Sequence, residues 1–535
     1  MDFIADLHIH SRFSRATSRK LDLPLLDYWA RRKGLHLIGT GDVTHPEWLA
    51  ETREQLIESE EGLYRLKQGT GGPSSPEGAA TRFVLSAEIS SIYKKNGRVR
   101  KIHSLILLPN FEVAENFSQR LDGIGNIRSD GRPILGLDAK DLLELCLDTS
   151  QDIFFIPAHI WTPWFSLFGS KSGFDSVEEC FEDLSEHIFA LETGLSSDPA
   201  MNWRLSSLDG YTLVSNSDAH SAAKLGREAN LFATDFSFSA MIKALKGRGG
   251  FQGTIEFFPE EGKYHLDGHR KCGQRLEPED TVRHDGLCPV CGKPVTLGVM
   301  YRVLELADRP AGARPPSANP FNCIVPLPEV LSEIVGVGPQ SKKVGRFYDD
   351  LLDQLGPELY ILLEAPIEDI TTAGGELLGL GIKRMRNGEV HLEGGYDGEF
   401  GKVRLFDPTE MESLAGQNAL FTIAPASKKK KTPAAQKAKP EPRVKKETPR
   451  NLTKNPAPNL LFPADPLLDD LNDFQLEAVI HDETPLCIAA GPGTGKTLVL
   501  TRRICWLIRE GLARPNEILG ITFTRKAREE MSSRL

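Results

Sequence analysis

Short apolar runs alternate with longer stretches of helical composition over the first 262 residues of the chain. The runs "FVLSAEIS" and "DIFFIPAHI" are typical, since each contains or ends in polar, titratable side chains. Such alternation indicates βα units around a parallel sheet. In these sheets the chemistry gathers at the carboxyl ends of the strands. We therefore predict an α/β domain over residues 1–262, with its functional site at those strand ends.

The pattern changes four times after residue 262. A cysteine-rich stretch precedes a mixed α+β segment, with helices expected around "LPEVLSEIVGVGPQSKKVGRFYDDLLDQLG" and strands in "IKRMRNGEVHLEGGYDGEFGKVRLF". A stretch rich in Lys, Pro and Ala follows, and we expect it to be disordered because it has too little apolar surface to fold. The last segment starts a new βα unit. The segments predicted after the first domain are residues 263–310, 311–425, 426–466 and 467–535.

Composition and charge narrow the class of protein. The chain of 535 residues is too long for one hydrophobic core. No apolar run approaches the roughly 18 residues of a membrane helix, and the cysteines are too few for a disulfide scaffold, so we expect a cytoplasmic protein without a membrane partner. The net charge of −10 argues weakly against nucleic acid, but eleven Lys or Arg and two Glu give residues 427–455 a local charge of +9. This basic stretch could track DNA phosphates, although charged runs are more often solvated tails.

The chain opens with "DLHIHSRFSRATS" at residues 6–18. His8 and His10 are two residues apart, so a strand would place both imidazoles on one face. Taken alone, the stretch is equally a half-buried strand with surface histidines. Other apolar runs carry further imidazoles and carboxylates, and a polynuclear metal site explains them together. These residues are Asp42, His45, Glu88, His103, His159, Glu192, Asp218 and His220, of which Glu192 is equally a helix cap or an ion-pair partner.

The mixture of imidazoles and carboxylates favours zinc, manganese or iron over calcium, and magnesium stays a candidate with zinc and manganese. We expect two or three such divalent cations. Cations about 3.5 to 4 Å apart activate water near neutral pH and hold phosphoryl oxygens, which is the chemistry of phosphate ester hydrolysis. The metal site therefore predicts a phosphatase or a nuclease.

These motifs resemble those of the polymerase and histidinol phosphatase (PHP) family. The match rests on "DLHIHS", on "SDAH" and on the intervening acidic and histidine residues, whereas "GDVTH" stands where many members have TDH and "SRATS" where many have a further histidine. The resemblance implies a distorted (β/α)7 barrel with a trinuclear site, in which Asp218, Glu88 and His159 are catalytic. By resemblance the three metals are held by His8, His10, Glu88 and Asp218, by Glu88, His103 and His159, and by Asp42, His45 and His220.

Two motifs in the second segment, "HRKCG" and "CPVCG", share the pattern ligand-x-x-Cys-Gly. The glycine after each second ligand allows a tight turn. Three thiolates and one imidazole make a closed tetrahedral site, which is the arrangement of structural zinc. Exposed thiols without metal are the alternative, and His265 or His284 could replace the imidazole ligand. We predict a zinc ribbon with the ligands His269, Cys272, Cys288 and Cys291.

A possible DNA contact lies in "EIVGVGPQSKKV", residues 333–344, which resembles a helix-hairpin-helix. Such a turn would point the backbone N–H groups around Gly336 and Gly338 at a phosphate, with Lys342 and Lys343 beside them. A plain glycine-rich helix connection is the alternative. We predict that this turn binds the DNA backbone.

The last segment contains "LCIAAGPGTGKTLVLTRR", a strand, a phosphate-binding loop and a helix. With "LNDFQLEAV" before it and "TFTRKA" after it, the segment resembles the start of a UvrD-type superfamily 1 helicase. The sequence stops at Leu535, before a Walker B acidic pair or an arginine finger, so we expect weak ATP binding at most and no unwinding. The nucleotide-binding residues by this resemblance are Gln475, Gly493, Gly495, Lys496 and Thr497.

Residues 1 to about 425 as a whole resemble the endonuclease Q family. The stretches that carry the resemblance include "IADLHIHSRFSRATS", "GTGDVTHPEWL", "SAEISSIY", "PAHIWTPWFSLFGSKSGFDS", "LVSNSDAHS" and "GGYDGEFG". The resemblance implies a DNA repair hydrolase that nicks the phosphodiester 5′ to deaminated bases (uracil, hypoxanthine, xanthine) or abasic sites. Damaged DNA, and other repair factors, are the partners that it implies.

In the mechanism that we expect, a damaged nucleotide leaves the base stack and enters a pocket while its 5′ phosphate reaches the metals. The aromatic residues after His159 could line this pocket or fill the gap, although such clusters are more often core. A phosphatase of small phosphate monoesters and a non-catalytic DNA-binding adaptor are the alternative functions. The aromatic residues are Trp161, Trp164, Phe165 and Phe168.

Overall fold

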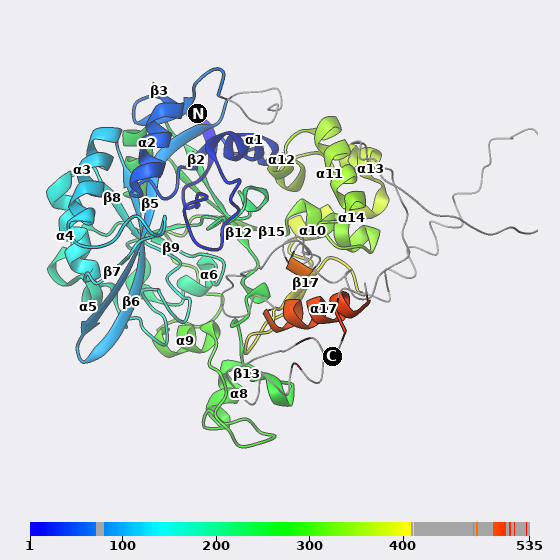
Figure 1. The fold of residues 1–535 in the computed structure, drawn as a ribbon. Helices are drawn as coiled ribbons and strands as arrows, with labels where there is room; N and C mark the ends of the chain where they lie inside the picture. The colour runs from blue at the N-terminus through cyan, green and yellow to red at the C-terminus, as the bar shows by residue number, and fades with distance from the viewer. Residues whose placement is uncertain are drawn as a thin grey trace, which may run out of the picture. The chain divides into compact units, whose positions relative to one another are not determined.

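The computed structural model of the chain falls into two compact units, Met1–Ala426 and Ser427–Leu535. The first unit contains every residue predicted to bind a metal (Figure 1). The predicted linker, residues 426–466, lies outside the described part of the chain. The structure describes residues 1–70, 80–407, 410, 475, 478–479, 496–509, 513–514, 518 and 531.

The first unit is built on an eleven-stranded sheet that mixes parallel and antiparallel neighbours. Strands β1, β2 and β5 are parallel to one another, whereas β11 and β6 pair antiparallel with β1 and β5. The strands β9 (Ala190–Glu192) and β10 (Thr212–Val214) form a separate parallel pair. The main path runs through β15 (Phe321–Ile324), β12 (Phe251–Phe257), β11 (Ala229–Ala233), β1 (Asp2–Asp6), β2 (Leu37–Gly39), β5 (Arg82–Lys95), β4 (Leu63–Leu66) and β3 (Leu56–Glu60), with β6 (Arg98–Leu108), β7 (Ile134–Leu135) and β8 (Phe154–Pro157) attached beside it.

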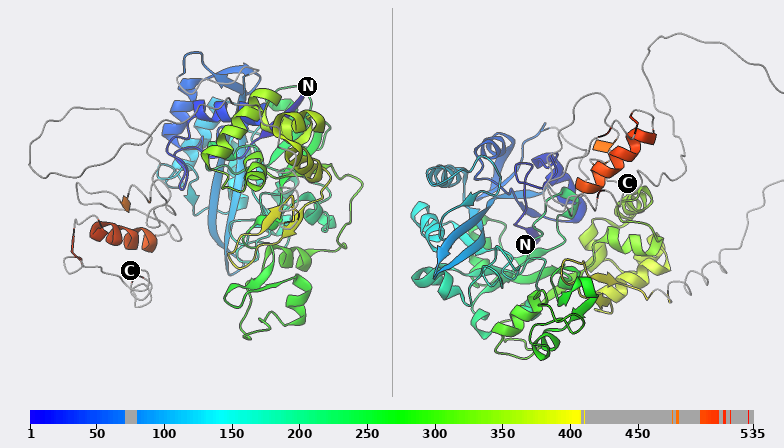
Figure 2. Two further views of the ribbon diagram at one scale, coloured as in Figure 1. Left: turned by 90° about the vertical axis from the view of Figure 1, so that its right-hand side faces the viewer. Right: turned by 60° about the horizontal axis from the view of Figure 1, so that its bottom comes forward.

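The expected α/β domain is present, but its sheet is mixed rather than parallel. A long hairpin of β5 and β6 explains much of the difference, and Figure 2 shows it as two extended blue arrows. At its turn Asn96 and Gly97 have φ values of 53° and 74°. An Asn-Gly pair between apolar strands is the preferred sequence for a turn with two positive φ values. The Asn96-Gly97 pair therefore indicates a hairpin in the sequence, which the prediction of βα units did not include.

Both faces of the sheet are buried. Along β5, Phe83 and Leu85 join the larger apolar cluster of the unit, and Val84 between them joins a second cluster on the other face. A strand buried on both faces is apolar throughout rather than alternating. This explains why "RFVLSAEI" reads as an almost continuous apolar run, and it makes the polar side chain of Glu88 within that run exceptional.

Helices cover the sheet, and the sequence marks where several begin and end. The side chains of Asp22, Asn110 and Asp138 each accept a hydrogen bond from an N–H in the first turn of a helix. Gly34 ends the first helix with a left-handed φ of 89°. The helices of this part are α1 (Leu23–Lys33), α2 (Pro46–Gln55), α3 (Phe111–Asp122), α4 (Ala139–Thr149), α5 (Val177–Phe181), α6 (Pro199–Asn202), α7 (Phe238–Leu245) and α9 (Val299–Leu306).

The remainder of the first unit is a small cysteine-bearing hairpin and a helical region. The hairpin is β13 (Asp267–His269) and β14 (Gln274–Leu276), followed by α8 (Pro278–Arg283). A second small hairpin of β16 (His391–Glu393) and β17 (Lys402–Arg404) comes after the helices. The helices are α10 (Leu327–Val335), α11 (Lys342–Leu355), α12 (Glu358–Leu363), α13 (Ile367–Gly374) and α14 (Glu376–Arg386).

One predicted strand is wrong. The stretch "IKRMR" was expected to start a strand, but it forms the end of α14. Leu378, Ile382 and Met385 are buried on one side of this helix, and their spacing of four and three residues is helical. In the second unit, α17 (Lys496–Arg509) is the one helix with assigned bounds among the described residues.

Candidate metal centre

Ligand atoms of four side chains converge beside the end of β1. The Nε2 atom of His10 lies 3.2 Å from Oε2 of Glu88 and 2.9 Å from Oδ1 of Asp218. The Nε2 atom of His8 lies 3.5 and 3.8 Å from the same two oxygens. The four ligand atoms all lie within 4.8 Å of one another, so one cation can be held between them. Two imidazoles and two carboxylates suit zinc, manganese or iron.

A second group shares Glu88 with the first. Oε1 of Glu88 lies 2.5 Å from Nδ1 of His103 and 3.2 Å from Nε2 of His159. The two imidazole nitrogens are 3.2 Å apart. Since Oε2 of Glu88 faces the first group and Oε1 faces the second, this carboxylate is placed to bridge two cations.

The second ring nitrogen of each strand-end histidine is held by a buried carboxylate. His8 donates from Nδ1 to the carboxylate of Glu192, at 3.0 Å from both oxygens. His10 donates from Nδ1 to Oδ1 of Asp42, also at 3.0 Å. A proton fixed on Nδ1 leaves the Nε2 lone pair free to bind a metal. Glu192, which the sequence left open between a site role and a helix cap, thus orients a ligand.

Three residues of the site have left-handed backbone conformations that are rare for non-glycine residues. Asp42, His159 and Asp218 have φ values of 51°, 31° and 47°. Such conformations cost on the order of 1–3 kcal/mol each and persist where the surrounding structure imposes them. Gly194 permits one of them, because a Cβ atom at this position would lie 2.4 Å from the Cβ of His159.

The carboxylates and imidazoles of the cluster shift one another's pKa values. Burial lowers the pKa of His8 and His10, but the neighbouring carboxylates outweigh this and hold both pKa values well above the ordinary range. Burial also raises the pKa of Glu88, yet its close contact with Nδ1 of His103 and the charge of Arg132 hold it well below the usual value. Burial lowers the pKa of His103 to about 4. The pKa values of Asp42, Glu88 and Asp218 are all held below the ordinary range, so these three carboxylates are ionised and require cationic partners.

The donor set fits divalent cations. The Nε2 atom of His8 is fully buried and has no hydrogen-bond partner among the described residues, although it faces the carboxylates of the first group. A buried polar atom without a partner is costly, and coordination would satisfy it. All the ligands except Asp218, whose side chain is 26% exposed, are nearly inaccessible to solvent. The centre therefore opens on the side of Asp218.

The three residues assigned by resemblance to a third metal lie differently from the expectation. Both carboxylate oxygens of Asp42 accept hydrogen bonds, which come from His10, Ser11 and Ser14. His45 donates from Nε2 to the backbone oxygen of Arg128 at 3.0 Å. His220 donates from Nδ1 to the backbone oxygen of Asp218 at 2.9 Å. Among the described residues these three are not gathered within 4.8 Å of one another as the first two groups are, and a third metal at Asp42, His45 and His220 stays a prediction.

The sequence analysis missed one residue of the centre, Arg132. Its Nη1 atom lies 3.1 Å from Oε2 of Glu88, and its side chain is 25% exposed. Arg132 follows Asp130 and Gly131 in the loop between α3 and β7, a turn sequence with no apolar run to mark it as a strand end. Only its position in the fold reveals it.

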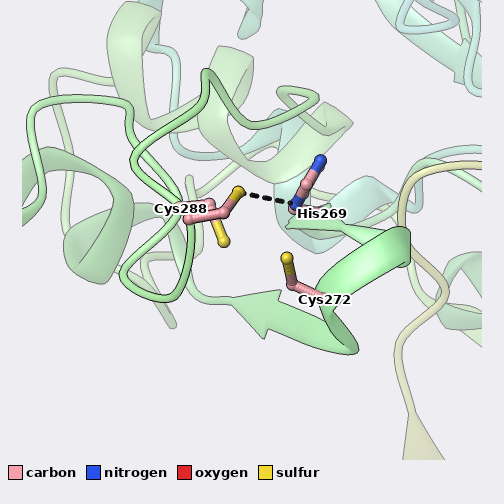
Figure 3. A group of neighbouring side chains, drawn as sticks. His269, Cys272 and Cys288 are labelled. Carbon is pink, nitrogen blue, oxygen red and sulfur yellow. Dashed lines mark hydrogen bonds between the residues drawn. The ribbon is translucent and has the colours of Figure 1, made fainter.

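The four predicted zinc ligands also converge. The sulfur of Cys291 lies 3.4 Å from Nδ1 of His269, and all four ligand atoms lie within 4.8 Å of one another. Figure 3 shows His269, Cys272 and Cys288 around one common space. The alternative His265 is not in the group; it is buried, and burial lowers its pKa to about 4. The identity of the metal stays a prediction.

The two groups of expected DNA contacts differ in their exposure. Gly336 ends α10 with a φ of 70°, and Gly338, Lys342 and Lys343 are exposed at the start of α11. Their contact with DNA stays a prediction.

The four aromatic residues after His159 differ in exposure. Trp161 and Phe168 are buried in the core, and the ring centroid of Phe165 lies 4.7 Å from that of His103. Trp164, at 43% exposure, is the most open to solvent of the four.

The predicted nucleotide site is described in part. Gly493 and Gly495 lie outside the described residues. Lys496 and Thr497 are the first residues of α17, as expected for a helix after a phosphate-binding loop. Gln475 is helical. Nucleotide binding by these residues stays a prediction.

Comparison with family models places two regions of the chain. Residues 471–535 match the UvrD/REP helicase N-terminal domain, and residues 326–389 match the MJ0043 C-terminal domain. The helicase UvrD1 of Mycobacterium tuberculosis is 51% identical over 82 residues, which are 15% of this chain and 10% of the helicase. The chain therefore spans about a tenth of the helicases that it matches.

Relatives of the first unit match over nearly their whole length. The Bacillus subtilis protein YqxK is 31% identical over 424 residues, 75% of this chain and 98% of YqxK. The lesion-specific endonuclease PfuEndoQ of Pyrococcus furiosus is 30% identical with a TM-score of 0.67, over 77% of this chain and 99% of that structure. An endonuclease Q in complex with a 27-mer duplex carrying an abasic lesion is 32% identical with a TM-score of 0.66, over 77% and 98%. Among the described residues, no helix combines the length and apolar character needed to cross a membrane.

Proposed function

This chain belongs to the endonuclease Q family and is a hydrolase of DNA phosphodiester bonds. From that premise we propose that it nicks DNA on the 5′ side of deaminated bases (uracil, hypoxanthine or xanthine) and of abasic sites. The observation that carries the proposal is the pair of ligand groups joined by Glu88, which opens on the side of Asp218.

The residues of the centre divide into those that bind cations and those that orient them. Divalent cations bound there would acidify the attacking water and polarise the phosphoryl oxygens. Glu88 would contribute a ligand to both groups, because its two oxygens face different groups. Glu192 and Asp42 keep the Nδ1 protons of His8 and His10 in place. Asp218, the most exposed ligand, faces the side from which the phosphodiester enters.

A pocket beside His159 suits an extruded nucleotide. Its volume is about 240 Å³, and Thr162, Trp164 and Tyr264 contribute to its walls. The two aromatic rings are 6.2 Å apart at an interplanar angle of 80°. An aromatic face stacks on any base, and extruding a nucleotide costs less where pairing is already weakened. Damage recognition in this proposal therefore combines easy extrusion with contacts in the pocket.

Two further features would bind the DNA backbone. Structural zinc at His269 and the three cysteines would hold the small hairpin of β13 and β14 together. The exposed turn between α10 and α11 would present its N–H groups and Lys342 to a phosphate. Neither feature has a use in the hydrolysis of small phosphate monoesters.

A nicking assay tests the function. The protein is incubated with Mn²⁺ or Mg²⁺ and end-labelled duplexes that carry one uracil, hypoxanthine, xanthine or abasic site, beside an undamaged duplex. We expect a single nick 5′ to each lesion. Release of phosphate from a chromogenic monoester without nicking would indicate a phosphatase, and binding without cleavage would indicate an adaptor.

The variant Asp218→Asn tests the assignment of the centre. It removes one charged ligand from the first group, so we expect nicking to be lost while lesion DNA is bound with similar affinity in an anisotropy assay. Asp235→Asn is the matched control, since Asp235 is exposed, belongs to neither ligand group and follows Ala233, which pairs with Asp2 at the other end of β1. Cleavage by Asp218→Asn at the wild-type rate would refute the assignment.

A further inference from the structure

We propose that Arg132 is a catalytic residue that binds the scissile phosphodiester beside the metal centre. This role deepens the proposed endonuclease function and rests on it. The guanidinium reaches Oε2 of the bridging Glu88 at 3.1 Å, and a quarter of its side chain stays open to solvent. The Glu88 oxygen that it reaches is the one that faces His10 in the first ligand group, to which Asp218 also belongs.

The loop that carries Arg132 is anchored to the site from several directions. Gly131 donates from its N–H to the backbone oxygen of Phe13 at 2.9 Å, and Ser90 of β5 donates to the oxygen of Pro133 at 3.0 Å. Arg132 donates its own N–H to Oδ1 of Asp130. His45 holds the oxygen of Arg128. A side chain on such a loop is positioned before the substrate arrives, which is the condition for stabilising a transition state.

Residues expected to bind a third metal are part of this anchor. Gly131 packs so closely on Asp42 that a Cβ atom would lie 2.4 Å from its Cγ. Asp42, which also orients His10, therefore supports the arginine loop, and His45 supports it through the backbone oxygen of Arg128. The loop places a fixed positive charge beside the two ligand groups.

The charge of the centre explains why a further positive charge would help to bind an anionic phosphodiester there. The centre contains the four carboxylates Asp42, Glu88, Glu192 and Asp218, and two divalent cations would neutralise them. An incoming phosphodiester is an anion, and its charge spreads over the equatorial oxygens in the transition state. Arg132 uses one N–H group on Glu88, so its planar fork retains further donors for those oxygens.

The competing explanation is that Arg132 only balances the charge of Glu88 and touches no substrate. The two roles predict different effects of the negative charge of the DNA phosphate on binding. If Arg132 binds the phosphate, its removal weakens the interaction only when that phosphate is charged. If it only balances Glu88, its removal alters metal binding and acts on every substrate alike.

The first measurement is the single-turnover nicking rate of the full-length metal-loaded protein. We expect Arg132→Ala to lower the rate on the order of 100-fold, the size of the loss when one preorganised charge-stabilising donor is removed. Arg132→Lys should recover part of the rate, because a lysine keeps the charge but not the fork. Arg98→Ala is the matched control, since Arg98 is exposed beside the turn of the β5–β6 hairpin, and it should nick like the wild type.

The second measurement is binding, made in the Asp218→Asn background so that no cleavage interferes. Two labelled abasic duplexes are compared, one with the natural phosphodiester 5′ to the lesion and one with an uncharged methylphosphonate there. Arg132→Ala should weaken binding of the first duplex about tenfold, as expected for a charged hydrogen bond, and should leave binding of the second unchanged. The manganese affinity of the double variant Arg132→Ala, Asp218→Asn, measured by calorimetry, should stay within about twofold of that of Asp218→Asn alone.

These outcomes separate the two proposals. If the wild type nicks no lesion duplex, the proposed function fails. If the wild type nicks but Arg132→Ala nicks equally fast, or loses the same affinity for both duplexes, the role of Arg132 is overturned. A loss of manganese affinity equal to the loss of rate would also overturn it, in favour of charge balance at Glu88.

Discussion

At the scale of single residues, the centre shows that residue type does not decide between binding a metal and orienting a ligand. Asp218 and Glu88 contribute oxygens to a ligand group, whereas Asp42 and Glu192 each hold a histidine Nδ1 atom. All four are carboxylates close to histidines. For His8 and His10 the difference lies in which ring nitrogen each carboxylate reaches: Asp42 and Glu192 reach Nδ1, whereas Glu88 and Asp218 reach Nε2.

Glu192→Gln tests the orienting role. The amide presents one oxygen and one NH₂ group where His8, the N–H of His159 and Asn216 now meet two oxygens, so it holds the ring of His8 less firmly. We expect manganese affinity to fall about 10- to 100-fold, the usual effect of losing such a partner. Isothermal titration of the metal-free protein measures it. Glu186→Gln, at a side chain 80% exposed, is the control, and equal affinities of the two variants would contradict the role.

A second prediction concerns pH and stability. Burial raises the pKa of Glu256 to about 8, against the hydrogen bonds from Thr254, Ser215 and Thr193. Burial and the charge of Glu256 also raise the pKa of Glu228. Below the ordinary carboxyl pKa both folded and unfolded states hold the proton, and as pH rises toward 8 only the folded state does, so the free energy of unfolding falls across this window.

Glu256→Gln removes this titration. In the metal-free protein, with chelator present, we expect the melting temperature of the wild type to fall from about pH 5 to about pH 8 and that of the variant to fall less. The slope removed is at most about 1.4 kcal/mol per pH unit. Differential scanning fluorimetry across the window measures it. Parallel curves for the two proteins would show that Glu256 is ionised throughout.

At the scale of elements, short-range sequence signals agree well with the structure. Asp22, Asn110 and Asp138 begin helices as N-caps, and Asn96-Gly97 turns β5 into β6. These signals are local because the hydrogen bonds concerned join residues a few positions apart. The loop of Arg132 has no such signal. Its conformation depends on Phe13, Asp42 and Ser90, which are distant in sequence.

Gly131→Ala tests the packing of that loop. An added Cβ would lie 2.4 Å from Oδ2 of Asp42 and 2.7 Å from Oγ of Ser14, so either the loop or the support of His10 has to move. We expect the nicking rate to fall at least tenfold and stability to fall by about 1–3 kcal/mol, the usual cost of overpacking. Gly136→Ala is the control, because nothing lies within 4 Å of a Cβ there. Equal rates for the two variants would show that the loop tolerates the displacement.

At the scale of the whole molecule, the centre and the fold that builds it belong to the first unit. Met1–Ala426 is compact by itself, and relatives that match it over 98% and 99% of their length have no counterpart of the helicase-like region in the match. The second unit matches about a tenth of the helicases that resemble it. We therefore expect the catalytic function to be separable from the helicase-like segment.

A chain ending at Ala426 tests this separation. We expect it to nick lesion duplexes at a rate within about threefold of the full-length protein at low salt, because every ligand and its support is retained. The lost basic stretch, residues 427–455, contributes phosphate contacts only through charge, so any loss of affinity should shrink as salt is raised. Single-turnover rates and anisotropy titrations at two salt concentrations measure both effects. Loss of nicking in a folded truncated chain would show that the second unit takes part in cleavage.

Residue types and their spacing along the chain predicted the chemistry of the site and the residues that carry it. Imidazoles and carboxylates beside buried apolar runs predicted a metal centre, and paired ligand-x-x-Cys-Gly motifs predicted a second cluster; both sets of side chains converge. This was possible because residue type sets ligand preference and strand periodicity sets the face. The order of the strands, the contacts of Asp42 and Glu192 with histidine Nδ1 atoms, and the position of Arg132 beside Glu88 depend on the tertiary structure. His8 and Glu192 are 184 residues apart, and only the folded sheet determines which nitrogen meets which oxygen.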